Sequence, residues 1–223
     1  MSRRIPLVAG IVFAVLFAIA LLMVPPLPGI DQQGNAVVSH LRDHAGVLRL
    51  QALLITLGFL ALVILLSYAR TRLDGPAGYA FTIGSALIIA EFSIELWFTS
   101  GLALHANTLD PAVARTVADV AVMFGPILTV ADVIVAVPIA LAAKAGRFPR
   151  WLGVLAAVFA VEQFVETVTI IGGPGLFISP GGPMNMLLGG ALFIVFFAAL
   201  GVSTALTPDP TTSQSKTVNG AAE

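Results

Sequence analysis

The amino-acid sequence predicts an all-α fold: a polytopic transmembrane helical bundle of six spans, with both termini on the cytoplasmic side (N-in/C-in). Three observations lead to this prediction. The composition is 58% hydrophobic and only 10% charged, whereas soluble domains contain about 25% charged residues. Six apolar segments are each long enough to cross a bilayer. The basic residues between these segments are distributed unevenly over the two sets of connections.

The first predicted span follows a basic start and leads into two consecutive prolines. An apolar run of this length is typical of a retained helix, because the apolar region of a cleaved signal peptide is shorter. Residues 24–49 then provide room for a short amphipathic helix that runs into the second span. We interpret His40, Arg42 and His44 in this segment as surface residues of an interfacial helix. All six spans cover about residues 5–24, 51–69, 77–101, 118–143, 151–171 and 184–206.

The fourth span is the longest and contains Pro126 and Pro138. Proline lacks a backbone N–H and clashes with the preceding turn, so we expect bends near both prolines, with Asp132 on the inner side. Asp110 is a suitable N-cap for this helix, and Pro111 suits its first position.

The connection IGGPGLFISPGGP, residues 171–183, is rich in Gly and Pro and carries no charge. We interpret it as a turn-rich outer connection, and a segment that dips over a pocket is the alternative. Residues 1–206 are expected to form a single transmembrane domain. Residues 207–223 are polar and rich in Pro, Ser and Thr, which predicts a disordered cytoplasmic tail.

The orientation follows from the 11 Lys and Arg residues. The positive-inside rule places the connections with more of them in the cytoplasm, and the expected location is the bacterial inner (plasma) membrane. One set of connections and termini holds Arg3, Arg4, Arg70, Arg72, Lys144, Arg147, Arg150 and Lys216, and the other holds Arg42, Arg49 and Arg115.

Five carboxylic acids lie deep inside the predicted spans: Glu91 and Glu95, Asp132, and Glu162 and Glu166, whereas Asp119 lies near the outer end of the fourth span. Residues four apart share one face of a helix. A rise of about 1.5 Å per residue places Glu162 and Asp132 near the bilayer midplane and the other three about 5–10 Å outward. No Lys, Arg or His lies at comparable depth in the six segments. We expect the five acids to converge on one cavity open to the outer face, where they are protonated, hydrated or neutralised by a bound cation.

Several chemistries are excluded by what the sequence lacks. There is no cysteine, and the three histidines fall outside the apolar runs, so thiolate, haem and zinc sites within the bilayer lack their usual ligands. The net charge of −1 gives no basis for binding nucleic acid. An all-oxygen site for Mg²⁺, Ca²⁺ or Mn²⁺ stays open, as do an organic cation and a transferred proton. No cofactor is identified.

Aromatic side chains lie near the acids in the sequence. They are expected either to line an apolar pocket beside the acids or, more commonly, to serve as packing and interface anchors. These residues are Phe92, Trp97, Phe98, Phe124, Phe159 and Phe164.

The stretches VPPLPGIDQQGNAVVSHLRDHAGVLRLQALL, LDPAVARTVADVA and AKAGRFPRWLGVLAA resemble uncharacterised bacterial six-helix integral membrane proteins of a domain-of-unknown-function type. The similarity covers about residues 5–205, and the FPRWLG junction at 148–153 is its most recognisable piece. This resemblance implies a polytopic inner-membrane protein. It implies no activity, so it assigns no role to the acids.

Three classes of function are consistent with these observations. The first is an intramembrane acid–base enzyme acting on a lipophilic substrate such as an isoprenoid or lipid. The second is a small cation or proton-coupled transporter, expected as a homodimer because six helices enclose little space. The third is a structural or accessory membrane subunit whose protonated acids are hydrogen-bonded between helices. The expected partners are the lipid bilayer and a lipophilic or cationic small molecule. An apolar pocket beside the acids would favour the enzyme.

Overall fold

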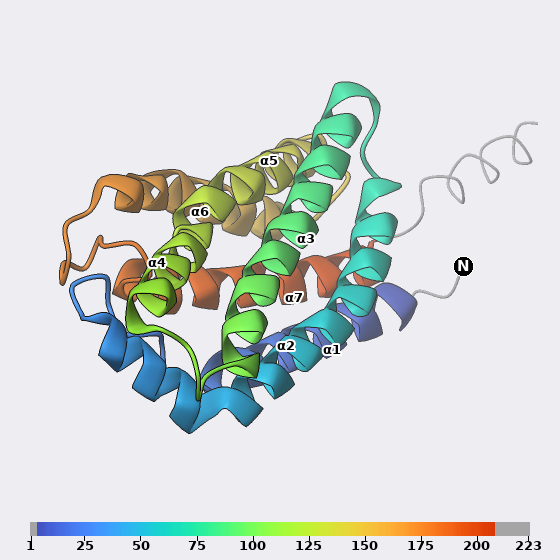
Figure 1. Ribbon diagram of the computed structural model, residues 1–223. Coiled ribbons are helices and arrows are strands. Elements are labelled where there is room, and N and C mark those ends of the chain that lie inside the picture. The colour runs from blue at the N-terminus through green and yellow to red at the C-terminus, as the bar shows by residue number, and fades with distance from the viewer. Residues whose placement is uncertain (1–3, 208–223) are drawn as a thin grey trace, which may run out of the picture.

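The computed structural model describes residues 4–207, and every regular element among them is helical (Figure 1). The 3-10 helix η1 continues α6, and the π-helix η2 leads into α7. Residues 208–223 of the predicted tail lie outside the described residues. The elements are α1 (Arg4–Leu22), α2 (Gly34–Arg70), α3 (Gly75–Leu104), α4 (Pro111–Val122), α5 (Phe124–Lys144), α6 (Arg150–Glu166), η1 (Thr167–Ile171), η2 (Met184–Gly189) and α7 (Gly190–Leu206).

Six helical segments among the described residues are long and apolar enough to cross a membrane. They are α1, α2, α3, α4 with α5, α6 with η1, and η2 with α7. Each segment contains most or all of one predicted span, so the all-α prediction and the positions of six apolar helices long enough to span a membrane are confirmed.

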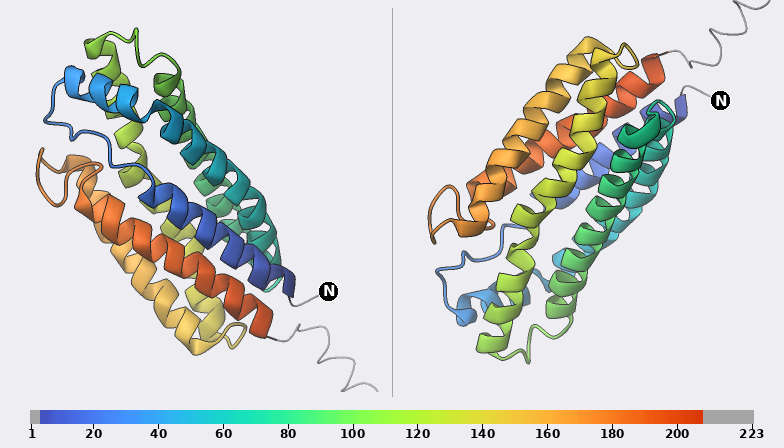
Figure 2. Two further views of the ribbon diagram at one scale, coloured as in Figure 1. Left: turned by 90° about the horizontal axis from the view of Figure 1, so that it is seen from below. Right: turned by 90° about the horizontal axis from the view of Figure 1, so that it is seen from above.

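The six segments pack as a closed ring, in the order α1, α2, α3, α5, α6, α7 and back to α1 (Figure 2). The interior of the ring is filled largely by aromatic side chains. Phe13, Phe159, Phe196 and Phe197 are fully buried, and neighbouring rings meet mostly edge to face. Many large apolar side chains remain on the outside of the bundle, as expected of a surface that faces hydrocarbon.

The bundle has two distinct ends (Figure 2). The end that we call proximal carries the start of α1, the end of α7 and the connections 71–74 and 145–149. The end that we call distal carries the connections 23–33, 105–110 and 172–183. The predicted asymmetry of basic residues follows these ends. Among the described residues, the proximal end has Arg4, Arg70, Arg72, Lys144, Arg147 and Arg150, and the distal end has Arg42, Arg49 and Arg115.

Helix α2 is much longer than a membrane span. Its 37 residues correspond to about 55 Å at roughly 1.5 Å per residue, against a hydrocarbon thickness of about 30 Å. The predicted amphipathic segment is therefore continuous with the second span. Its first turns pack against α4 and the end of α3, where Val37, Leu41, Leu102, Ala114 and Ala118 form a second, smaller core.

The fourth span is interrupted at Met123, between α4 and α5. Pro126 explains the position, because it lacks the N–H that would bond the carbonyl of Val122 four residues earlier. This agrees with the bend expected near Pro126, whereas α5 continues through Pro138 without interruption. The predicted start of α4 is confirmed, since Asp110 Oδ1 accepts from the N–H of Ala112 at 2.8 Å.

Helices α1 and α7 approach each other closely. A Cβ placed on Gly201 would lie 2.9 Å from Gly10 Cα and 2.9 Å from the Pro6 carbonyl oxygen. Both obstacles are backbone atoms, so a side chain at this position can be accommodated only if the helices move apart. Small residues allow such close backbone contacts between membrane helices.

Replacing Gly201 by Ala is therefore expected to destabilise the bundle by about 1–3 kcal/mol, the usual range for overpacking. Thermal unfolding in a non-ionic maltoside detergent, followed by circular dichroism, measures this effect. The matched control is Gly101→Ala on α3, where a Cβ meets nothing within 4 Å. An equal effect of both substitutions would contradict the proposed role of this contact.

Candidate functional site

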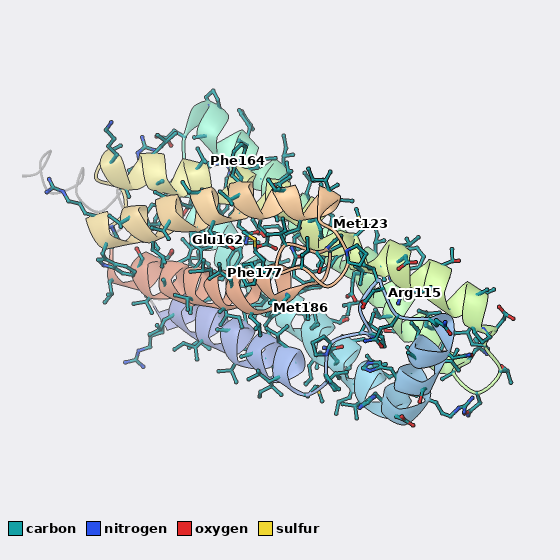
Figure 3. All side chains as sticks on the ribbon, turned by 90° about the vertical axis from the view of Figure 1, so that its left-hand side faces the viewer. Arg115, Met123, Glu162, Phe164, Phe177 and Met186 are labelled. Carbon is teal, nitrogen blue, oxygen red and sulfur yellow. The ribbon has the colours of Figure 1, made fainter. Side chains whose placement is uncertain are left out.

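Four of the five predicted acids come together in the interior of the bundle. Asp132 of α5 is 1% exposed, and its carboxyl group interacts electrostatically with those of Glu166, Glu91 and Glu162. Helix α3 contributes Glu91, and α6 contributes Glu162 and Glu166. Glu162 projects from α6 into the bundle (Figure 3). Helices α3 and α6 thus place three glutamates within electrostatic range of Asp132 on α5.

Two amide side chains hold this acid cluster in place. Glu166, which is 3% exposed, accepts an N–H from Asn185 on Oε1 at 2.5 Å and one from Gln163 on Oε2 at 3.0 Å. The same Gln163 nitrogen donates to Glu162 Oε2 at 2.8 Å, and Asn185 also donates to Thr169 Oγ1 at 3.2 Å. Each amide therefore binds two acceptors, which fixes the relative positions of the two glutamates.

The π-helix η2 presents Asn185 to the cluster. Such wide turns are rare and occur frequently at functional sites. A Cβ on Gly189, at the end of this turn, would overlap the Glu166 carboxylate, so a larger residue here would displace that side chain. Asn185 Oδ1 also accepts the backbone N–H of Gly181 at 3.1 Å. One side chain thus links the 172–183 connection to the buried acids.

Three carboxylate oxygens of the site are buried without a hydrogen-bond partner among the described residues: Asp132 Oδ1, Glu91 Oε2 and Glu162 Oε1. Buried polar atoms are nearly always satisfied in native proteins, and an exception calls for a specific explanation. The missing partner of such an oxygen is a proton, a water molecule or a bound ligand.

The arginines at the distal end do not supply that partner. Arg115 Nη2 pairs with Asp119 Oδ1 at 2.7 Å, and its Nη1 donates to the carbonyls of Pro28 and Gly29. Arg49 is exposed.

A resident metal ion is not favoured by the arrangement of ligands. Among residues 4–207, no group of three or more His, Cys, Asp or Glu side chains is placed to hold a metal ion. The acids lie close enough to influence one another but do not form the shell of oxygen ligands that Mg²⁺ or Ca²⁺ requires.

A cavity of about 190 Å³ lies next to the cluster, toward the distal end of the bundle. Its rim includes residues 24–27 of the first distal connection and Gly181 of the last. The walls are mainly apolar, and Asp132 and Gln163 line it in the interior of the bundle. The 172–183 connection, which carries Phe177, passes over this end of α6 and α7 (Figure 3). The segment consists of turns, as the sequence predicts, and its Gly181 also lines the cavity.

Glu95 lines the same cavity as Asp132, one helical turn beyond Glu91 on α3. His40 also lines the cavity, and its ring lies 4.6 Å from that of His44. The interpretation of His40 as a surface residue is thus wrong, because α2 turns this side chain toward the bundle. The interpretation holds for Arg42, which is exposed.

The aromatic residues near the acids divide into two groups. Phe92 and Phe124 line the cavity, together with Phe17 of α1 and Phe193 of α7. Phe159 is buried in the core, stacked on Phe196. Trp97 and Phe164 are each 71% exposed, and Phe98 is also exposed, so these three are not part of the site.

Sequence reasoning missed Gln163 and Asn185. A signal was present for Gln163, since it lies between Glu162 and Glu166 within an apolar helix. Asn185 is a single polar residue at the start of the last span, and its role depends on a π-helical turn that no simple sequence pattern indicates.

The fold and site define an all-helical protein with six helices suited to cross a membrane and a partly open apolar cavity that ends at buried carboxyl groups. No family model, curated protein or solved structure matches the chain.

Proposed function

We propose that the chain is an integral membrane acid–base enzyme that acts on a lipophilic substrate, such as an isoprenoid or lipid, bound in the cavity. One observation carries the proposal: Asp132 lines the cavity, is 1% exposed and has a buried, unpartnered Oδ1. An apolar pocket that ends at such a group, with perturbing charges close by, is the usual form of an active site.

The arrangement provides both partners of a proton transfer. In the proposed reaction, protonated Glu95 donates its proton to the bound substrate, and Asp132 in its ionised form accepts a proton from the adjacent position. One proton enters and one leaves the substrate, so the proton count is conserved. Glu91, Glu162 and Glu166 surround Asp132 away from the cavity and take the accepted proton from it. Interacting carboxyl groups release their protons in separate steps, so one cluster contains both acid and base.

A positively charged intermediate would be stabilised at the same place. The carboxylates that remain after proton transfer lie in an environment of low dielectric constant, where their attraction to a cation is stronger than in water. The apolar walls exclude competing water.

The test is solvent deuterium incorporation. The purified protein in maltoside detergent is incubated in D₂O with a lipid extract of the cells that produce it, and carbon-bound deuterium is measured by mass spectrometry. We expect incorporation into one lipophilic species, above that with heat-denatured protein. Equal incorporation in both samples would overturn the enzyme proposal.

The proposal includes insertion into the bacterial inner membrane with the proximal end in the cytoplasm. It is supported by the six apolar helices and by the greater number of basic residues at that end. Two reporters are fused after Lys216, one active only in the cytoplasm and one active only in the periplasm. We expect activity from the first reporter and none from the second. The reverse result would contradict this orientation and place the cavity on the cytoplasmic side.

A small cation or proton-coupled transporter is the second candidate. Two further acids, Glu91 and Glu162, interact with Asp132 but do not line the cavity. They extend the series of carboxyl groups deeper into the bundle, which favours the transfer of a proton or cation along it. Proton uptake into liposomes that contain the protein, followed with a pH-sensitive dye, distinguishes the candidates. An enzyme produces no flux, whereas a transporter produces a flux that Asp132→Asn abolishes.

A further inference from the structure

We propose that the natural occupant of the cavity carries an organic cationic group, of the ammonium type, located between the carboxyl groups of Asp132 and Glu95 and the phenyl rings of the cavity wall. This inference rests on the proposed function, because it names the class of substrate for the same site.

The charges that line the cavity favour a cation. Asp132 and Glu95 are acidic, and no Lys or Arg is found among the described residues that line the cavity. A phosphate, diphosphate or carboxylate group at this depth would face two acids without a basic partner. His40 is the one lining residue able to carry a positive charge, and it lies on the distal part of α2. Anionic head groups are therefore poor ligands here.

Asp132 also has an oxygen available for such a ligand. Its side chain is 1% exposed and lines the cavity, and its Oδ1 has no hydrogen-bond partner in the described part of the chain. An ionised carboxylate in this position is stable only with a cation close by. A bound ammonium group supplies that charge, and an N–H of a primary, secondary or tertiary ammonium can also donate to Oδ1.

The aromatic wall favours an organic cation over a metal ion. Phe17, Phe92, Phe124 and Phe193 line the cavity, and Phe92 lies within 6 Å of the other three, measured between ring centroids. Phenyl rings attract ammonium groups through their quadrupoles. A divalent metal ion instead needs a shell of oxygen ligands, and no group of ligands among residues 4–207 is placed to form one.

The size of the cavity limits the ligand. Its volume of about 190 Å³ lies below the roughly 300–1,000 Å³ of pockets that hold drug-sized molecules. The occupied part of the substrate is therefore compact. An apolar portion of the molecule has room among Leu21, Val24 and Met186, which line the cavity near its rim.

The experiment compares three small probes of similar shape: choline, its uncharged isostere 3,3-dimethyl-1-butanol, and the anion 3,3-dimethylbutyrate. Binding to the full chain in maltoside detergent is measured by isothermal titration calorimetry. We expect choline to bind at least about 10-fold more tightly than the neutral isostere, and the anion to show no binding. Equal affinity for choline and the neutral isostere would overturn the inference.

Variants locate the binding site. Asp132→Asn is expected to weaken choline binding at least about 10-fold, and Phe193→Leu several-fold, because each removes one contribution to the cation site. Glu95→Gln provides an independent test if Asp132→Asn does not fold. The matched control, Asp43→Asn, removes the same charge from an exposed position of α2 and should leave binding unchanged. Equal loss in the control, or unchanged binding in the folded site variants, would contradict the inference.

The two proposals can fail separately. If deuterium incorporation depends on Asp132 but choline and its isostere bind equally, the enzyme proposal stands and the cationic substrate is wrong. If choline binding depends on Asp132 but no deuterium is incorporated, the cation site stands and the enzyme proposal falls.

Discussion

Replacing Asp132 by Asn is expected to slow deuterium incorporation into the lipophilic substrate at least about 100-fold, the lower end of the usual contribution of a general acid or base. The amide preserves the shape of the side chain and its place beside the cavity. It cannot donate a carboxylic proton or accept one at neutral pH. The measurement is the initial rate of incorporation, compared with wild type at equal protein concentration.

A purely structural role for Asp132 predicts the opposite result, with Asn tolerated in rate and in thermal unfolding. Glu162→Gln and Glu91→Gln test the supporting acids in the same assay, and each is expected to reduce the rate while the fold is retained. Asp43→Asn is the control for a general loss of negative charge. A wild-type rate in Asp132→Asn would remove this residue from the proposed chemistry.

Replacing Asn185 by Ala is expected to have the largest effect on stability. The substitution leaves Glu166 Oε1 and Thr169 Oγ1 without their donor, and the N–H of Gly181 without its acceptor. Each buried group left without a partner costs about 1–3 kcal/mol, so the loss of two donors inside the bundle amounts to about 2–6 kcal/mol. For a chain of this size, 1 kcal/mol corresponds to roughly 2–4 °C in the unfolding midpoint.

We therefore expect the thermal unfolding midpoint of Asn185→Ala to fall by at least about 5 °C in maltoside detergent. Asn107→Ala is the matched control, since Asn107 is exposed in the distal connection 105–110. The control should unfold within about 1 °C of wild type. If both variants unfold together, the amide network does not hold the site in place.

The helices could be predicted because their signal is local. Continuous apolar runs and basic residues at their ends define each span without reference to the others. The interruption of the fourth span was equally local, since Pro126 removes one backbone donor from its own helix. The amphipathic helix expected within residues 24–49 is the first part of α2, which begins at Gly34. Its first turns contain polar residues, and packing against α4 stabilises them as a helix.

The acids were found from sequence because an ionisable residue inside an apolar run is conspicuous. Their surroundings were harder to predict. The position of His40 depends on how far α2 extends, and Phe17 and Phe193 come from opposite ends of the chain. A cavity wall assembled from such distant segments depends on tertiary packing, which leaves no periodic pattern in the sequence.

The closed ring of helices has a consequence for the order of assembly. Phe17 belongs to α1 and Phe193 to α7, and their rings pack 5.1 Å apart on the cavity wall. During synthesis α1 emerges first, yet one of its two neighbours in the ring emerges last. If the chain inserts into a membrane as proposed, a partly synthesised chain with its first five spans in place therefore presents its buried acids on an open groove. Until α7 arrives, another membrane protein or a chaperone must cover that groove, or lipid must fill it.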